Sequence, residues 1–127
     1  STSPRDAIYR METMTLMSEL DLPIKVIRAQ IASAIDLIIH LSRLKGGNRT
    51  ITYITEISGM EADTVVMSDI FKFEQTGVDR TGAVMGELRP TGIRPLFTTK
   101  LEANGFKLSP EVFGANLAEI LRDQQRK

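Results

Sequence analysis

The sequence predicts a mixed α/β fold: two helices, a β-hairpin, a second short hairpin, and then short C-terminal helices. Three observations indicate this order. Apolar residues recur at three- and four-residue spacing through roughly the first 35 positions, as on one face of a helix. The middle of the chain is dominated by β-branched and aromatic residues, which favour strands. In the last third of the chain, prolines and glycines recur at the spacing of short helices, with proline at a helix start and glycine after a helix end.

The first helix is expected to begin at Pro4, with Ser3 as its N-cap and Asp6 near the positive end of the helix dipole. Its apolar stripe is Ile8, Met11, Met14 and either Leu16 or Met17. We expect the methionines to pack in the core, and an adaptable partner surface is the alternative. Because the chain opens on a helix cap, we expect it to be cut from a longer protein.

The second helix is expected to open after Asp21-Leu22-Pro23, since the residue before proline is disfavoured in helical conformation. Its predicted apolar stripe is Ile24, Ile27, Ile31, Ala34 and Ile35. Four later segments have the composition of strands, with turn residues between them. The expected strands are residues 37–41, 50–57, 64–73 and 83–88, and the expected turns are 45–48, 58–63 and 78–82.

The last region predicts short helices. One is expected to start at Pro95 and to stop at Asn104-Gly105. Ser109-Pro110 is expected to cap the next. A final helix is expected to place Leu117, Ile120 and Leu121 on one face.

The composition excludes several classes of protein. The chain has 127 residues, enough for one domain, and its 16 basic residues balance 16 acidic ones, which counts against a nucleic-acid partner. The absence of cysteine removes disulfides, thiol catalysis and cysteine-based zinc sites. No apolar run reaches the roughly 18–20 residues that a membrane span needs, so a soluble, cytoplasmic domain is expected.

The sequence lacks the main motif of a nucleotide-binding protein. None of the nine glycines is followed by lysine, so the chain holds no phosphate-binding loop. Residues 65–69 and 53–56 loosely imitate the apolar strand with a terminal acidic residue that handles magnesium in ATPases. We interpret Asp69 and Glu56 as acidic residues on the solvent side of a strand, or at its end.

The single histidine, His40, has no recognisable catalytic partners. Asp36 and Ser42 are near it in sequence but form no known motif, so a structural histidine is the preferred interpretation. One imidazole and scattered carboxylates predict no metal site. Arg5, Arg43 and Arg94 are the candidates for a nucleotide-proximal or subunit-interface position, with solvated or locally paired arginines as the alternative.

An ordered series of segments resembles the C-terminal part of the type II/IV secretion ATPases. More narrowly, it resembles the branch that drives Tad/Flp (type IVb) pilus assembly, the CpaF type. The series spans residues 1 to 113 in the right order and spacing. Its segments are Ser3–Ala7, Arg10–Met14, Leu22-Pro23, Arg28–Ile38, Ser42–Leu44, Thr55–Glu61, Asp69–Phe71 and Thr91–Pro95.

The resemblance implies a piece of a larger motor. The phosphate-binding loop, the acidic strand and a histidine-containing segment of that family would all lie upstream of Ser3, so no catalytic residue is carried over to this chain. Residues 1–60 would belong to a RecA-like ATPase domain, and residues 61–127 to a C-terminal appendage folded with it. Arg5 would follow the histidine segment closely, near the nucleotide and a subunit boundary.

The resemblance also implies partners and cofactors. The intact protein would be a cytoplasmic hexamer, peripheral at the inner membrane, that docks on platform proteins of the secretion system. ATP and magnesium would belong to that parent, and this chain alone is expected to bind no cofactor and to be inactive. Without the upstream half, the hairpin from Leu37 to Ile57 should expose an edge and an apolar face, so self-association is expected.

Two other functions stay open. The first is an adaptor or binding module of the secretion machinery that performs no nucleotide chemistry. The second, ranked below it, is an independent enzyme built around His40 and a nearby carboxylate.

Overall fold

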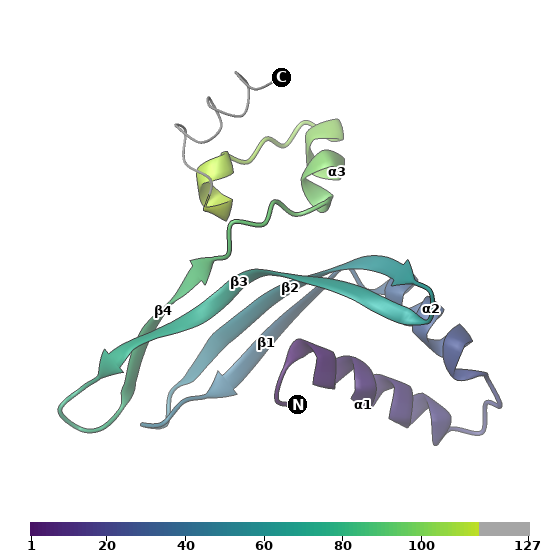
Figure 1. The fold of residues 1–127 in the computed structure, drawn as a ribbon, viewed down its shortest axis with the longest axis horizontal. Coiled ribbons are helices and arrows are strands. Elements are labelled where there is room, and N and C mark those ends of the chain that lie inside the picture. The colour runs from purple at the N-terminus through teal and green to yellow at the C-terminus, as the bar shows by residue number, and fades with distance from the viewer. Residues whose placement is uncertain (115–127) are drawn as a thin grey trace.

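The computed structural model describes residues 1–114 of the chain. The final helix predicted around Leu117, Ile120 and Leu121 lies outside the described residues. Within them the fold is mixed α/β, with three α-helices, a single-turn 3-10 helix and one four-stranded antiparallel sheet (Figure 1). The predicted fold class is confirmed at this level.

Two helices open the chain, α1 (Pro4–Leu16) and α2 (Ile24–Ala34). The predicted cap of α1 is present, because the Ser3 hydroxyl accepts a hydrogen bond from the backbone N–H of Asp6 at 3.1 Å. This bond satisfies one of the N–H groups that a helix start leaves without an internal partner. The break at Pro23 is also where the sequence predicts it.

Four strands follow in simple up-and-down order. They are β1 (Leu37–Arg43), β2 (Arg49–Glu61), β3 (Thr64–Val78) and β4 (Val84–Pro90). Each strand pairs antiparallel with its neighbour in sequence, so β1 and β4 are the two edges of the sheet. Residues on both sides of position 60 belong to this one sheet.

The predicted turn over residues 58–63 is too long. β2 continues through Glu61, and only Ala62 and Asp63 join it to β3. Ala62 has a φ of 53°, the left-handed conformation that a tight two-residue connection requires. The pairing shifts register between Ile57 and Gly59, so a bulge absorbs the glycine that the sequence suggests as a turn.

The second hairpin is longer than predicted, since β3 has 15 residues and β4 extends to Pro90. A register shift between Gln75 and Gly77 again accommodates a glycine within the strand. The predicted loop after Val78 is confirmed. Its Asp79 carboxylate accepts hydrogen bonds from the Thr81 hydroxyl and from the backbone N–H groups of Thr81 and Ala83, and these bonds lower the pKa of Asp79 below its ordinary value.

Replacing Gly86 with alanine should destabilise the chain by about 2 kcal/mol, within the range for overpacking. A Cβ at this position would collide with the backbone carbonyl of Glu74 and with the ring of Phe73. That carbonyl belongs to the neighbouring strand and cannot retreat without disturbing the β3–β4 pairing. Gly77→Ala is the control, because nothing lies within 4 Å of its Cβ. Urea unfolding of both variants checks this, and equal losses would contradict it.

The main core lies between the two helices and one face of the sheet. Its buried residues are Ile8, Ile27, Ile31, Ile57 and Val65. Met11, Met60 and Met67 are half-buried and pack against this cluster.

The predicted apolar stripe of α1 is correct only in its first half. Ile8 is buried and Met11 half-buried, but Met14 and Met17 are 63% and 82% exposed. Core packing is therefore the wrong prediction for these two methionines. Each helical residue turns about 100°, so Met17 lies on the side of α1 opposite Ile8, and Glu12 takes the buried position one turn after Ile8.

The other face of β1 is not covered within the described residues. His40 is buried in the middle of the strand, while Leu37, Ile39 and Leu41 alternate with it and are 41–56% exposed. Ile51, the partner of Leu41 on β2, is 36% exposed. We call Leu37, Ile39, Leu41 and Ile51 the β1 face.

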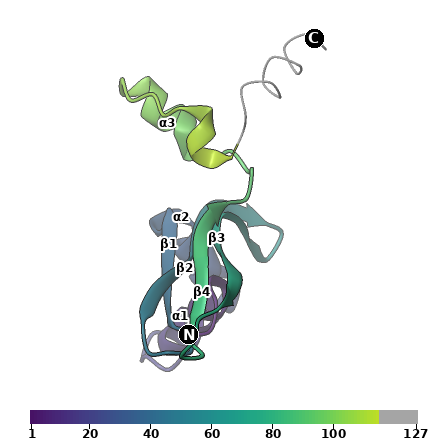
Figure 2. The same cartoon turned by 90° about the vertical axis from the view of Figure 1, so that its left-hand side faces the viewer.

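The chain after β4 forms a small lobe beyond the end of the sheet (Figures 1 and 2). It consists of α3 (Phe97–Ala103) and the 3-10 turn η1 (Pro110–Phe113). The predicted start at Pro95 is right to within two residues, and the predicted stop at Asn104-Gly105 is confirmed, with Gly105 at a φ of 85°. Phe113 is buried beside the rings of Phe71 and Phe97, with ring centroids 6.3 Å apart in each pair.

Candidate functional site

Arg5 lies on the first turn of α1 and reaches the sheet. Its side chain is half-buried, and the Nη2 atom donates a hydrogen bond to the backbone carbonyl of Val65 at 3.2 Å. The cap at Ser3 and the proline at position 4 fix the start of the helix, and with it the direction in which Arg5 leaves the backbone. This arginine is therefore held in place rather than freely solvated.

A cavity of about 250 Å³ opens beside Arg5. Its lining residues are Ser3, Pro4, Arg5, Tyr53, Met67 and Asp69. We call it the Arg5 cavity. The Thr55 hydroxyl donates to the Asp69 carboxylate at 2.8 Å, and the Lys72 amine lies 5.8 Å from the centre of the Tyr53 ring. The cavity thus offers guanidinium donors and a carboxylate, which suits a polar ligand or a polar segment of a neighbouring polypeptide.

Asp69 and Glu56, the acidic residues of the two ATPase-like segments, come from paired stretches of β2 and β3. Thr55 is the register partner of Asp69. The interpretation of Glu56 as a solvent-facing residue is wrong, because its side chain is only 5% exposed. Asp69 is half-buried and lines the open Arg5 cavity, so its carboxylate is accessible from solvent there.

Glu56 binds the lobe to the sheet. One carboxylate oxygen accepts from the backbone N–H of Leu96 and the other from that of Phe97, each at 2.9 Å. These N–H groups belong to the start of α3, which has no side-chain cap of its own. The sequence does carry a signal for this, since Arg94-Pro95-Leu96 offers no capping residue and the helix start needs an acceptor from elsewhere.

A second feature that no sequence pattern predicts is the ion pair of Arg28 with Glu12. The Arg28 Nε atom lies 2.9 Å from the Glu12 carboxylate, and the Glu12 side chain is 7% exposed. This hydrogen bond raises the pKa of Arg28 above its ordinary value. Arg28 also donates to the carbonyl of Asp63 at 3.3 Å, so it joins both helices to the β2–β3 turn.

The other two candidate arginines lie apart from the Arg5 cavity. Arg43 is exposed at the end of β1, and its register partner on β2 is Arg49. Arg94 is exposed in the lobe, where it bonds to Thr98 and pairs with Glu102 at 2.9 Å. The structure does not bring the three arginines together at one site.

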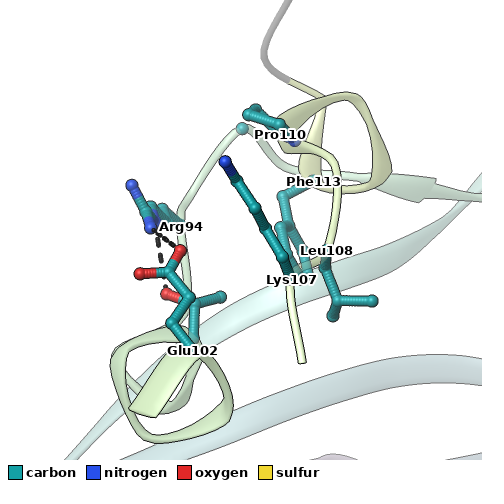
Figure 3. A pocket seen from close by; sticks show the side chains of 8 residues that line it. Arg94, Glu102, Lys107, Leu108, Pro110 and Phe113 are labelled. Carbon is teal, nitrogen blue, oxygen red and sulfur yellow. Dashed lines mark hydrogen bonds and ion pairs between the residues drawn. The ribbon is translucent and has the colours of Figure 1, made fainter. Parts of the chain in front are cut away.

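Arg94 borders a separate cavity of about 160 Å³ within the lobe (Figure 3). Arg94 and Glu102 form one side of it. Lys107, Leu108, Pro110 and Phe113 form the other. Arg94 forms an ion pair with Glu102 in the same lobe, as the alternative interpretation of a locally paired arginine predicts.

His40 is buried in a network of hydroxyl and carbonyl groups. Its Nδ1 lies 3.0 Å from the Thr52 hydroxyl and 3.4 Å from that of Ser42, and its Nε2 lies 3.1 Å from the Ser1 carbonyl. A carbonyl only accepts, so in this contact the Nε2 atom is the donor. Within residues 1–114 these contacts include no carboxylate. They support the interpretation of His40 as a structural residue.

No model of a known protein family matches the chain, and no curated protein matches it. Residues 1–114 contain no group of three or more histidine, cysteine, aspartate or glutamate side chains placed to hold a metal ion. In the same residues, every helix is too short or too polar to cross a membrane.

Proposed function

We propose that this chain is the C-terminal, non-catalytic segment of a hexameric secretion ATPase of the type II/IV class, in the Tad/Flp pilus-assembly branch. The parent motor would power pilin polymerisation or protein export. The ordered resemblance of residues 1–113 to that class supports the assignment. The ATP, the magnesium and the phosphate-binding loop would belong to the upstream half of a RecA-like domain.

The single structural observation that carries the proposal is the β1 face. Leu37, Ile39 and Leu41 project outward from the edge strand of the sheet and are 41–56% exposed. Exposed apolar residues on an unpaired edge strand promote aggregation, and folded proteins normally cover them. A larger domain that extends the sheet beyond β1 would pair this edge and bury this face.

The Arg5 cavity fits the same proposal. Arg5 keeps further guanidinium donors besides the one that binds the Val65 carbonyl, and they border an open cavity. An arginine held at the margin of a domain in this way can stabilise the phosphate charge of a nucleotide bound at a subunit boundary. In the hexamer we assign Arg5 this position, and platform proteins at the inner membrane remain the expected partners.

Replacing Arg5 with alanine in the parent ATPase should lower the turnover number about tenfold or more, as for an arginine that stabilises transferred phosphate. The thermal midpoint should change by only a few degrees, because the one part-buried hydrogen bond that Arg5 donates is worth about 1 kcal/mol. Steady-state phosphate release and thermal unfolding are the two measurements. Unchanged turnover would refute the role of Arg5.

Arg10→Ala is the matched control on the same helix. Its side chain is 67% exposed and makes one loose pair with Asp6, so its loss should leave turnover and stability nearly unchanged. Arg5→Lys keeps the charge but loses the planar fork of donors, and it should restore only part of the turnover.

The alternative function, an adaptor without nucleotide chemistry, is favoured by the exposed methionines of α1. The reading frame upstream of Ser1 separates the two proposals, because a phosphate-binding loop encoded there supports the motor. A start codon preceded by a stop codon supports the adaptor. Calorimetric titration of this chain alone with ATP and magnesium should show no binding, and clear binding would contradict both.

A further inference from the structure

A cluster of large apolar side chains lies exposed at the C-terminal end of α1 and just beyond it. Met14, Met17 and Leu20 are 62–82% exposed, and Met14 and Met17 lie about one turn apart on the same side of α1. We call these three residues the α1 patch. Three such side chains within seven residues form more apolar surface than a solvated helix end needs. Two of them are methionines, whose flexible and polarisable side chains adapt to varied partners.

Acidic residues lie at the C-terminal end of the α1 patch, while the basic Arg10 lies one helical turn before Met14 and pairs with Asp6. Glu19 and Asp21 are both exposed, and within residues 1–114 neither carboxylate takes part in an ion pair. An apolar surface with an acidic border fits an amphipathic helix that carries basic residues beside its apolar face.

The chain itself contains a segment with this pattern. Residues 115–127 place Leu117, Ile120 and Leu121 at helical spacing, and Arg122, Arg126 and Lys127 follow them. The same segment has only two acidic residues, so its C-terminal half is basic. A helix of 13 residues is about 20 Å long, enough to reach from Met14 near the end of α1 to beyond Leu20 in the loop that follows.

The position of Gly114 indicates which copy the segment reaches. Gly114 follows η1 in the lobe, where a Cβ on it would meet Pro90 and Gly92. In both views the lobe and α1 lie at opposite ends of the molecule (Figures 1 and 2). A second copy is therefore the better source of the occupant.

We propose that residues 115–127 of one copy dock as an amphipathic helix on the α1 patch of a second copy. The apolar residues of the segment cover Met14 and Met17, and its basic end pairs with Glu19 and Asp21. This contact joins two different surfaces, so it repeats from copy to copy and builds a ring or a filament. The inference goes beyond the proposed function and does not depend on it, because both surfaces belong to this chain.

The test is a charge exchange in the full chain, followed by sedimentation equilibrium. One variant carries Glu19→Lys and Asp21→Lys, and the other carries Arg126→Glu and Lys127→Glu. Each variant alone should associate about tenfold more weakly than the unaltered chain, equivalent to about 1.4 kcal/mol. Mixing the two should restore association. The basic segment of the first variant then meets the acidic patch of the second, and the acidic segment of the second meets the basic patch of the first.

Two further variants identify the contact. Met17→Glu should abolish association, while Val78→Glu, at another exposed apolar position, should leave it unchanged. Circular dichroism confirms that each variant is folded. A monomeric unaltered chain, or charge variants that fail to restore each other when mixed, would overturn the proposal. Association lost on Ile39→Glu and kept on Met17→Glu would instead assign the contact to the β1 face.

Discussion

Arg28→Ala should destabilise the chain by more than the loss of an arginine from an exposed ion pair does, because its partner Glu12 is buried. The substitution leaves the Glu12 carboxylate 7% exposed and without the guanidinium that it bonds at 2.9 Å. It also removes the hydrogen bond to the Asp63 carbonyl, which ties α2 to the β2–β3 turn. The Arg28 side chain is itself 29% exposed, so water screens part of the attraction within the pair.

Urea unfolding measures the loss of stability, and two further variants serve as comparisons. Arg89→Ala removes an arginine from exposed ion pairs with Glu74 and Glu87, and it should cost less than about 1 kcal/mol. The double variant Glu12→Met, Arg28→Met should recover most of the loss, because well-packed apolar residues can replace a buried pair. If Arg28→Ala costs no more than Arg89→Ala, the pair does not connect the helices as we describe.

Glu56→Ala should release the lobe from the sheet and cost about 3 kcal/mol or more. It removes two charge-assisted hydrogen bonds, each worth about 1.5–3 kcal/mol, from the N–H groups of Leu96 and Phe97. We expect Glu56→Gln to cost less, because the amide keeps one accepting oxygen.

Hydrogen exchange locates this effect. In Glu56→Gln the backbone amides of α3 should exchange faster, while those of β2 and β3 near Ile57 and Val65 keep their protection. Glu61→Gln is the control, since Glu61 is exposed at the end of the same strand. Equal acceleration across the sheet and the lobe would mean that Glu56 supports the whole fold and not the lobe in particular.

Local rules were enough for much of the secondary structure. Ser3 and Pro4 start α1, Pro23 separates the helices, and Gly105 follows α3, because caps, prolines and glycines act through their own backbone. The extent of the strands was harder to predict. Gly59 and Gly77 have the composition of turns, yet bulges hold both inside strands, and the neighbouring strand determines that outcome.

The candidate site shows the same division. The sequence alone determined the order of the elements, the absence of a phosphate-binding loop in this chain, and the placement of Arg5 on the first turn of a helix. Only the tertiary structure decided that Glu12 pairs with Arg28, that Glu56 binds the start of α3, and that Met17 is exposed. The physical reason is the separation along the sequence between the residues that make contact. Caps and turns depend on residues within four positions, whereas Glu56 meets its partners 40 and 41 residues away, and no local pattern encodes that pairing.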